Sequence, residues 1–359
     1  MKINLEAPFN SLSFGQVSTA ILRELLEKGV EVYLWPIGRK ADFFTFDLDE
    51  DTEKKIEKAY NNRFKGLDPN IPTLKIWHLN GSESSVGCGD KYLYTAYEAD
   101  MPTPEELAVC KNYKKVIFPS HESAKTFKDY GANNIECVPL GFDRFCLHNI
   151  EKEYFPKEII HWCLFGKFEK RKQTENIIRT WLSKYKNNPN HILSCFVFNP
   201  FFTKETMDSV MEQIGESANN ISALPYMKKN SEVNDAYNSC DIDLTGLSLA
   251  EGFNLPSFNL TALGKWSIVL NHTGHKTWAN EKNSILVQPE GKQPIYDNMF
   301  FRYGSPFNQG SMYEVSEETM TSAMQEAEKK AKTVNEEGLK LQKDMSFAVT
   351  TVKLLNLID

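Results

Sequence analysis

Two stretches of the sequence gather side chains that could bind an anion beside a hydroxyl-bearing ligand. In Gly166-Lys-Phe-Glu-Lys-Arg-Lys172, the lysines at 167 and 172 stand five positions apart after an apolar run. In Ser248-Leu-Ala-Glu-Gly-Phe-Asn-Leu-Pro256, an acid and a glycine precede a predicted helix. Lysines and the free N–H groups of a helix start attract phosphate, and a carboxylate accepts hydrogen bonds from hydroxyls. Together these groups suit a sugar phosphate.

The second stretch predicts an anion site made largely of backbone. Pro256 suits the first turn of a helix, so the preceding N–H groups would point at a ligand. Those N–H groups belong to Gly252, Phe253, Asn254 and Leu255. Gly252 permits close approach of the ligand, and Glu251 could accept hydrogen bonds from its hydroxyls. The lysines of the first stretch, taken alone, are equally typical of solvated surface.

The other candidate ligand groups favour structural roles. Asp241-Ile-Asp243 mimics a D-x-D metal motif, but its position at a strand start favours strand punctuation. Five histidines form no ligand spacing: His78, His121, His148, His161 and His191. We therefore predict no metal site and no cofactor.

Strands and helices alternate through the first half of the chain. Apolar runs at Lys2–Ala7 and Val30–Pro36 flank a helical pattern at Phe14–Lys28, which ends at a glycine. Thr103-Pro-Glu-Glu106 predicts a capped helix start, and Ser120 predicts another. We predict an open α/β unit of Rossmann type over residues 1–145.

The alternation stops over residues 142–157, a predicted linker, and then restarts. A second Rossmann-like domain is predicted over residues 155–338, and a C-terminal helix at about 340–359 is expected to pack back on the first domain. The predicted strands are Glu158–Phe165, Ile192–Phe198, Ile221–Leu224, Ile242–Thr245, Ser267–Asn271 and Ser284–Val287, and long helices are predicted at Glu317–Val334 and Gly338–Leu357. Ligands of such sheets bind beyond the carboxyl ends of the strands, so we expect a cleft between two domains that close about the linker.

Composition narrows the class of protein. The net charge of −7 lowers the expectation of general nucleic-acid binding, although a local basic groove could still bind it. No apolar run is long enough to cross a membrane, and the first residues read as a strand and not as a signal peptide. The seven cysteines are odd in number and widely spaced, which argues against disulfides and structural zinc. We expect a cytoplasmic protein.

The order of the motifs resembles the GT-B glycosyltransferases, and within them glycosyltransferase family 4, retaining enzymes that use nucleotide-sugars. The matching motifs of the second half are Gly166-Lys-x-x-x-x-Lys172, Asp241 opening a strand, Glu251-Gly-Phe-x-Leu-Pro256, and Gly264 before a strand. In the first half, Tyr97–Pro102, Ile117–Ser120 and Val138–Asp143 are similar to that family's first domain, and Ala7–Gly15 looks like the opening of phage-encoded glycosyltransferases. The resemblance covers residues 1–290 in order. It implies an α/β fold of GT-B type, with two Rossmann-like domains facing each other across a cleft.

The resemblance also implies a role for individual residues. Lys167 and Lys172 would neutralise the diphosphate of the donor, and Gly15 would let the loop after the first strand approach its phosphates. Glu251 would hold hydroxyls of the transferred sugar near the reacting carbon. The segment Gly252–Leu255 would complete the sugar and phosphate site.

At four positions the family's residue roles are assigned to this sequence less directly. Asn259 stands where the family usually has a second acid that grips the ribose, and an amide lacks its charge assistance. Trp266 stands where relatives often have proline. Glu98 falls where relatives place a His or an acid facing the acceptor, which implies a base or orienting group, although a surface acid before a turn is an equal alternative. His272 lies in a loop that borders the donor in relatives, with a structural role equally open.

Three functions follow from the resemblance. The first is a hexosyl- or pentosyltransferase that uses a nucleotide-diphosphate sugar, with a UDP-sugar as first expectation, retains configuration and needs no metal. Its acceptor would be a saccharide or small molecule. The second is the same chemistry on hydroxymethylated pyrimidines in phage DNA, which a basic strip along the cleft of the first domain would favour. The third is a non-catalytic nucleotide-sugar binder, suggested by Asn259.

Overall fold

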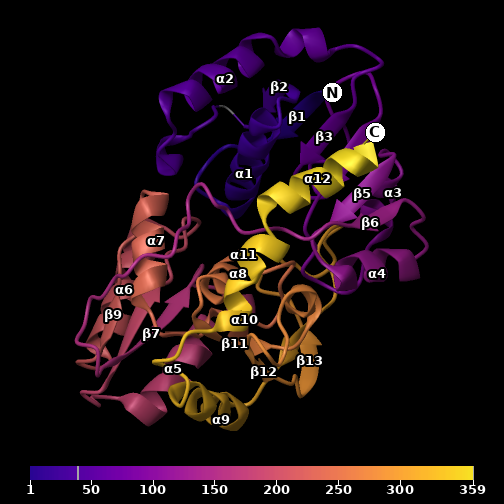
Figure 1. Ribbon diagram of the computed structural model, residues 1–359. Helices are drawn as coiled ribbons and strands as arrows, with labels where there is room; N and C mark the ends of the chain where they lie inside the picture. The colour runs from indigo at the N-terminus through magenta and orange to yellow at the C-terminus, as the bar shows by residue number, and fades with distance from the viewer. Residues whose placement is uncertain (39, 359) are drawn as a thin grey trace.

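The computed structural model describes residues 1–38 and 40–358, which form two α/β domains (Figure 1). The strands of the first sheet are β1 (Lys2–Ala7), β2 (Glu31–Pro36), β3 (Thr73–Ile76), β4 (Lys91–Tyr94), β5 (Lys115–Phe118) and β6 (Ile135–Cys137). Those of the second sheet are β7 (Ile160–Phe165), β8 (His191–Phe196), β9 (Ile221–Ala223), β10 (Ile242–Asp243), β11 (Trp266–Leu270) and β12 (Ile285–Val287). Every pairing within these two sheets is parallel.

Both sheets have the strand order of doubly wound folds. The first runs β2-β1-β3-β4-β5-β6 and the second β12-β11-β10-β7-β8-β9. The helices of the first domain are α1 (Ser13–Glu27), α2 (Glu50–Asn61), α3 (Pro104–Cys110) and α4 (His121–Asp129). Those of the second domain are α5 (Thr174–Tyr185), α6 (Lys204–Glu216), α7 (Asn230–Ser239), α8 (Leu255–Ala262) and α9 (Glu317–Glu328). Parallel strands joined by helices place all carboxyl ends of a sheet at one edge, where ligands bind.

The predicted helix starts are confirmed by their caps. The Thr103 hydroxyl accepts a hydrogen bond from the Glu106 amide, and the Glu106 carboxylate accepts one from the Thr103 amide at 2.9 Å. The Ser120 hydroxyl accepts a hydrogen bond from the Ser123 amide at 3.2 Å, which starts α4. Each side chain satisfies an N–H group that would otherwise lack a partner.

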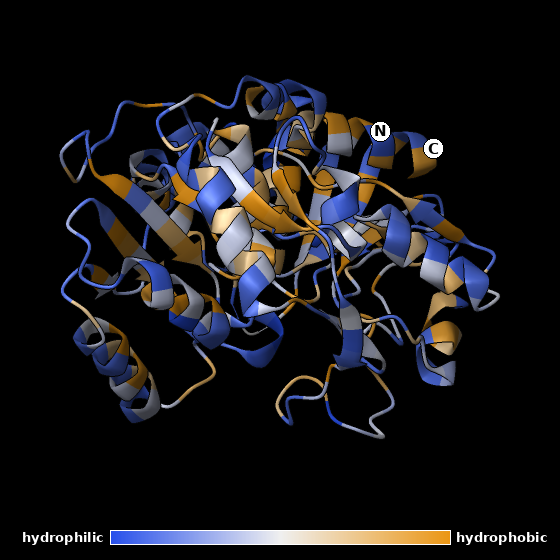
Figure 2. Ribbon diagram, turned by 90° about the horizontal axis from the view of Figure 1, so that it is seen from below, coloured by the Kyte–Doolittle hydropathy of each residue, from blue (hydrophilic) through white to orange (hydrophobic). Residues whose placement is uncertain are grey.

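The sheets are the apolar centres of the two domains. Figure 2 shows apolar residues concentrated along the strands and on the inward sides of helices. The largest fully buried side chains include Tyr92 in the first domain and Trp162 and Trp181 in the second. Sheets covered on both faces bury near-continuous apolar strands, and this burial stabilises each domain.

Three parts of the fold were not predicted correctly. The sequence predicted no strands for β3 and β4, which are short and each contain a lysine, so their local apolar pattern is weak. An antiparallel hairpin of β13 (Gly291–Pro294) and β14 (Ser311–Glu314) was also missed. The predicted long helix at 338–357 is instead three helices, α10 (Glu336–Leu339), α11 (Leu341–Asp344) and α12 (Phe347–Ile358).

The break before α12 has a local cause. Phe142 donates a backbone hydrogen bond to the Met345 carbonyl at 2.7 Å, and Phe347 donates one to the Phe142 carbonyl at 3.1 Å. These bonds replace helical ones at the point where the chain returns to the first domain. The helix α12 then lies against that domain (Figure 1), where Thr350 donates a hydrogen bond to the Pro139 carbonyl at 2.8 Å.

Candidate active site

The loops that follow β4 and β10 meet between the two domains. A Cβ atom added to Gly252 would lie 3.1 Å from the Cβ atom of Ala96 and 3.4 Å from the Tyr97 carbonyl oxygen. A larger residue at position 252 would therefore push the domains apart. The sequence predicted that Gly252 lets a ligand approach closely. In the structure it lets Ala96 and Tyr97 of the other domain approach closely.

Glu251 is buried within a cluster of charges. Its carboxylate accepts a hydrogen bond from the Lys172 ammonium group and another from the Ser248 hydroxyl at 2.7 Å. The second oxygen lies 3.2 Å from the Arg171 guanidinium. Burial alone would raise the pKa of Glu251, but Lys172 and Arg171 together hold that pKa below its usual range. Glu251 is therefore an ionised hydrogen-bond acceptor at neutral pH.

Arg171 is a site residue that the sequence did not reveal. Its side chain is 5% exposed, and its guanidinium lies 2.7 Å from Glu169 and 3.2 Å from Glu98, in addition to Glu251. One N–H group donates to the Ala250 carbonyl at 2.5 Å, and the buried Nε has no hydrogen-bond partner among the described residues. This arginine gathers three carboxylates, one of them from the other domain. The acid at 169, two positions before it, was the available signal of a buried pair.

Glu98 is the contribution of the first domain to this cluster. Its side chain is 32% exposed and its pKa is raised by burial, with a further rise from the nearby carboxylates of Glu251 and Glu169. Arg171 opposes that rise. A carboxyl group with a raised pKa at the edge of a cleft is a candidate general base.

Lys167 and Lys172 differ in their surroundings. Lys172 is mostly buried against Glu251. Lys167 is 31% exposed, lies 3.4 Å from Glu169, and stands 4.5 Å from the ring centre of Phe300. The partly exposed ammonium group of Lys167 is the one more accessible to an incoming anion.

The backbone at the start of α8 offers free donors. The amides of the predicted segment Gly252–Leu255 have no protein acceptor within hydrogen-bonding distance in the described part of the chain. Asn254 has a positive φ of 68°, and its side-chain Nδ2 group donates to the Thr245 carbonyl at 3.0 Å, which fixes the turn into the helix. The Phe253 side chain is buried against Phe258, so this residue faces the site through its backbone alone. Unpaired amides at the start of a helix form an anion site.

Two side-chain oxygens in this region also lack partners. The Asn254 Oδ1 and Asn259 Oδ1 atoms are buried without a hydrogen-bond partner within residues 1–38 and 40–358. An unpaired buried oxygen costs about 1–3 kcal/mol unless a ligand or water satisfies it. Asn259 projects from α8 on the same helix as the free amides, at the position where the resemblance implies a ribose contact.

Gly15 lies differently from expectation, and His272 has the structural role that the sequence left open. Gly15 is in the first turn of α1 and not in a loop, and a Cβ atom there would lie 2.1 Å from the Asn10 carbonyl oxygen. Its small size accommodates the preceding loop. His272 is fully buried, with its ring nitrogens 2.7 Å from the Ser248 carbonyl and 2.6 Å from the Thr273 hydroxyl. Burial lowers the pKa of His272 to about 3, so it is a neutral support for the loop that carries Glu251.

The hairpin β13–β14 connects the two domains beside the site. The Asn308 amide donates to Glu106 at 2.8 Å, and the Ser311 amide donates to Asp100 at 2.8 Å. Lys292 forms an ion pair with Asp100 at 2.7 Å. The hairpin belongs to the second domain by sequence, yet it holds the loop that follows Glu98 in place.

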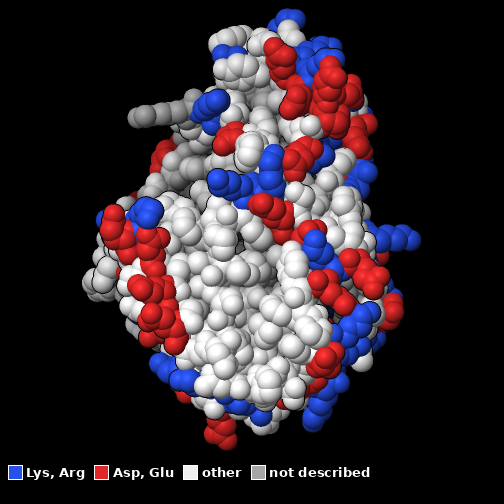
Figure 3. Space-filling model, turned by 90° about the vertical axis from the view of Figure 1, so that its left-hand side faces the viewer, with Lys and Arg blue, Asp and Glu red and all other residues white. Residues whose placement is uncertain are grey.

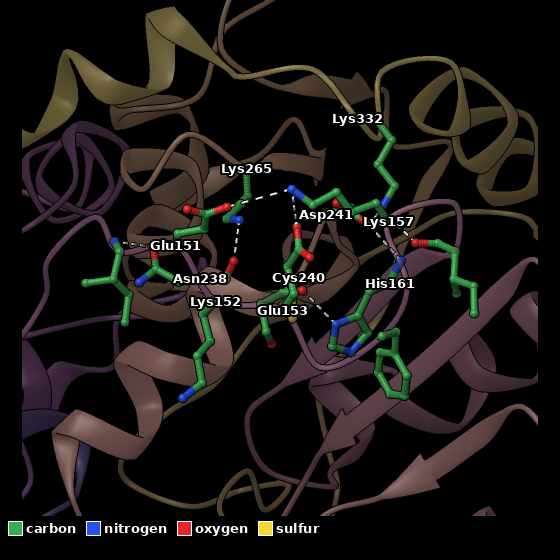
Figure 4. A pocket seen from close by; sticks show the side chains of 14 residues that line it. Glu151, Lys152, Glu153, Lys157, His161, Asn238, Cys240, Asp241, Lys265 and Lys332 are labelled. Atoms are coloured by element: carbon green, nitrogen blue, oxygen red, sulfur yellow. Dashed lines mark hydrogen bonds and ion pairs between the residues drawn. The ribbon is translucent and has the colours of Figure 1, made fainter.

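A separate cavity of about 190 Å³ lies beneath the linker (Figure 4). Two of its lysines are in ion pairs, with Lys332 lying 2.6 Å from Asp241 and Lys157 lying 3.3 Å from Glu153, and Lys265 donates to the Asn238 carbonyl at 2.6 Å. Asp241 also accepts a hydrogen bond from the His161 amide at 2.8 Å. The contacts of Asp241 tie Lys332 to the amino ends of β7 and β10, at the sheet edge opposite the charge cluster, and the Phe155 ring of the linker stands 4.8 Å from that of His161.

The pair at 241 and 243 has the structural role that the sequence favoured. Asp243 is fully buried and accepts hydrogen bonds from the Ser257 hydroxyl at 2.6 Å and the Thr245 amide at 2.7 Å. Within the described residues, no three His, Cys, Asp or Glu side chains gather closely enough to hold a metal ion. In the same part of the chain, no helix is long and apolar enough to span a bilayer.

No model of a known protein family matches the chain, and no curated protein is significantly similar to it in sequence. Solved structures are similar over nearly the whole chain. A sucrose-phosphate synthase from Thermosynechococcus elongatus has 12% identity and a TM-score of 0.71, covering 99% of this chain and 98% of its own. Anabaena HepE in complex with UDP and glucose has 12% identity and a TM-score of 0.66, covering 99% of both chains. A structure from E. coli with UDP-2-fluoro glucose bound has 10% identity and a TM-score of 0.66, covering 100% of this chain and 99% of its own.

The chain has the GT-B fold. This confirms the fold class predicted from the sequence. In this GT-B fold both domains contribute to the charge cluster, because Glu98 comes from the first and Arg171, Lys172 and Glu251 from the second.

Proposed function

We propose that this protein is a glycosyltransferase that moves a sugar from a nucleotide-diphosphate sugar to an acceptor hydroxyl. The proposal depends above all on one observation, the unpaired amides of Gly252–Leu255 beside the buried carboxylate of Glu251 and the ammonium group of Lys172. Anion donors and a hydroxyl acceptor meet there, as a sugar diphosphate requires. Two of the similar structures contain UDP with a sugar or a UDP-sugar, which supports a UDP-sugar as donor.

Each group has a proposed role in the reaction. Negative charge grows on the diphosphate as the bond to the sugar breaks, and Lys167, Lys172 and the free amides would stabilise it. Glu251 would accept hydrogen bonds from the sugar hydroxyls. Glu98 would accept the proton of the acceptor hydroxyl. These protein charges supply the stabilisation by themselves in this proposal, which therefore includes no metal.

The finer features of the reaction are proposed from the resemblance. Retention of configuration is typical of the family that the motifs resemble, and it is proposed on that resemblance alone. The transferred group would be a hexose or a pentose. Proton NMR of the first product formed, read at the anomeric position, tests retention directly.

A non-catalytic nucleotide-sugar binder is the second candidate. Asn259 favours it, because an amide in place of an acid weakens the expected grip on the ribose. The intact charge cluster around Glu251 opposes it, since a protein that only bound the donor would not need Glu98 in contact with Arg171.

Nucleotide release from a panel of nucleotide-sugars tests the proposal. Release from one donor, lost in Glu251→Ala and Lys172→Ala, would support the enzyme. Binding of the donor, detected as a thermal shift, without release even when a panel of acceptors is added would support the binder. Neither release nor a thermal shift with any nucleotide would refute both.

A further inference from the structure

The acceptor-facing edge of the first domain carries no cationic side chain in the three loops nearest the charge cluster. These loops follow β1, β3 and β4, and with the first turn of α1 they comprise residues 8–16, 77–90 and 95–102, none of which is Lys or Arg. They do contain acids, including Glu98 and Asp100. Because β1, β3 and β4 are neighbours in the sheet, the three loops form one continuous wall.

The cations closest to this wall in sequence are not part of it. Lys75 of β3 is buried, where its ammonium group donates to the Gly81 and Ser84 carbonyls at 2.9 and 2.8 Å and lies 3.3 Å from Glu6. It braces the loop after β3 from within. Arg39 and Lys40 follow β2, the edge strand of the sheet, and Arg39 lies outside the described residues.

Aromatic rings occupy the wall instead. Phe14 stands 4.4 Å from the ring of His78 and 5.9 Å from that of Trp77, measured between ring centres. The Trp77 and His78 rings are 5.3 Å apart and nearly perpendicular. His78 is exposed and the other two are half-buried, so part of each ring is open to solvent. We call these three residues the aromatic wall.

The aromatic wall lies at the boundary with the second domain. Gln16, two residues after Phe14, exchanges hydrogen bonds of 3.2 and 2.9 Å with Asn230 of that domain. Desolvation of the ring by surrounding protein atoms, with a smaller contribution from the charge of Lys167, lowers the pKa of His78. At neutral pH the ring is uncharged. Its nitrogens have no protein hydrogen-bond partner among the described residues, so both can bind hydroxyls.

We propose that the aromatic wall binds the acceptor and that the acceptor is a neutral saccharide. This inference rests on the proposed function. A sugar ring presents C–H groups on its face and hydroxyls around its rim, which match a ring surface edged by a free imidazole. The faces of aromatic rings are electron-rich and favour such C–H groups.

The absence of Lys and Arg from the three loops favours a neutral saccharide over a sugar phosphate or a polynucleotide as acceptor. A sugar phosphate or a polynucleotide brings phosphates that need Lys, Arg or helix N–H partners, and such contacts supply most of the affinity for DNA. The three loops offer acids in their place. The basic strip that would favour a DNA acceptor is therefore missing from residues 8–16, 77–90 and 95–102.

Matched acceptors provide the test. Full-length protein with the donor identified by nucleotide release is given glucose, glucose 6-phosphate, maltose, or duplex DNA containing 5-hydroxymethylcytosine, and transfer is quantified. Binding of the same acceptors is measured in parallel by saturation-transfer NMR with UDP present, so the result does not depend on turnover. We expect a neutral sugar to bind and react, and glucose 6-phosphate to have a KM about tenfold or more above that of glucose.

Two variants locate the binding surface. Trp77→Ala should raise the acceptor KM about three- to tenfold, and Trp77→Phe should restore most of the loss because it keeps an aromatic face. Tyr60→Ala, which removes an aromatic ring 42% exposed on α2, is the matched control and should leave the acceptor KM unchanged. A thermal shift with UDP verifies that each variant is folded.

The outcomes separate this inference from the proposed function. Preferential use or binding of glucose 6-phosphate or of DNA would overturn the neutral acceptor while leaving glycosyl transfer intact. Donor turnover with no neutral sugar bound or used would also overturn it, as would an unchanged acceptor KM in Trp77→Ala. Absence of both UDP binding and nucleotide release would instead refute the proposed function.

Discussion

The two edges that face each other across the cleft have opposite character. On the second domain, Lys167, Glu169, Arg171, Lys172 and Glu251 form a continuous network of ion pairs at the strand ends, most of it buried. On the first domain, the equivalent loops after β1, β3 and β4 contain aromatic rings and no cation. On the face drawn in Figure 3, basic and acidic side chains are interspersed around a broad uncharged area.

The difference indicates how the two substrates are distinguished. A buried network of charges binds a ligand of fixed charge, since ions removed from water need partners in good geometry. A wall of rings and neutral hydrogen-bonding groups binds an uncharged ligand by contact area and shape. Among residues 1–38 and 40–358, Glu98 is the one side chain of the first domain that joins the ion-pair network of the second, through Arg171. The following changes test this contrast, from the largest expected effect to the smallest.

Removing the buried guanidinium should have the largest effect. Arg171→Met leaves three carboxylates close together without their shared cation, and we expect a loss of about 3–5 kcal/mol in the free energy of unfolding. Urea unfolding at neutral pH measures it. Arg179→Met, which removes an exposed ion pair with Glu317, is the control and should cost less than about 1 kcal/mol. Equal losses in the two variants would mean that the cluster is no more than a surface network.

Removing the ammonium group beside Glu251 should mainly affect the rate. Lys172→Met deletes one donor to the leaving diphosphate, and we expect kcat for nucleotide release to fall about 10²–10³-fold. Lys170→Met is the matched control, because the Lys170 side chain is directed instead to the Tyr296 carbonyl at 2.9 Å. A rate in Lys172→Met within threefold of wild type would remove Lys172 from the mechanism.

Neutralising Glu98 should change the pH dependence of transfer. A base must be ionised, and the pKa of Glu98 is raised by burial, so acceptor-dependent turnover should fall as the pH drops through a value above the usual 4.5. Glu98→Gln should lower turnover about 10²-fold and abolish that acid limb. The pH profile of kcat/KM for the acceptor gives the measurement. Persistence of the acid limb in Glu98→Gln would assign the titration to another group.

Placing a cation in the cation-free loops of the first domain should reduce their expected preference for a neutral acceptor. Asn80 is exposed in the loop after β3, close in sequence to the aromatic wall. Asn80→Lys should lower the KM for glucose 6-phosphate by about tenfold relative to that for glucose, since a nearby ammonium group favours the phosphate. Asn61→Lys adds the same charge at an exposed position on α2 and should not change this ratio. If both variants change it equally, net charge and not the edge is responsible.

Restoring the second acid should give the smallest change. Asn259→Glu supplies a charged acceptor where a buried amide oxygen now lacks a partner, and we expect UDP to bind about fivefold more tightly. Asn259→Gln keeps the added length without the charge and serves as control. Isothermal titration gives both dissociation constants. Weaker binding by the glutamate variant would show that the pocket is not built around a ribose in the expected way.

The sequence predicted the parts of the site that depend on local geometry. Glu251 and the segment before α8 were recognisable because the acid, the glycine and the proline occur within six consecutive residues at a helix start. Arg171 was not, because an arginine in a lysine-rich run looks solvated until tertiary packing buries it. Gly15 was placed in a loop by the resemblance, although it falls within the predicted helical pattern Phe14–Lys28, and the helix indeed begins at Ser13. Trp77 and His78 were missed because β3, the strand that positions them, has too few apolar residues to predict.

The hairpin β13–β14 has a mechanical consequence for turnover. The chain already crosses between the domains twice, at the linker and again before α12, and the hairpin adds a third tie through Asp100, Glu106 and Thr103. Three connections between the domains restrict how far one domain can rotate relative to the other. Opening the cleft must either detach the hairpin, breaking at least five polar contacts of about 1 kcal/mol each, or bend the hairpin at its base on the second domain. The rate at which products leave would then be set by the detachment of this hairpin and not by the bond that is made.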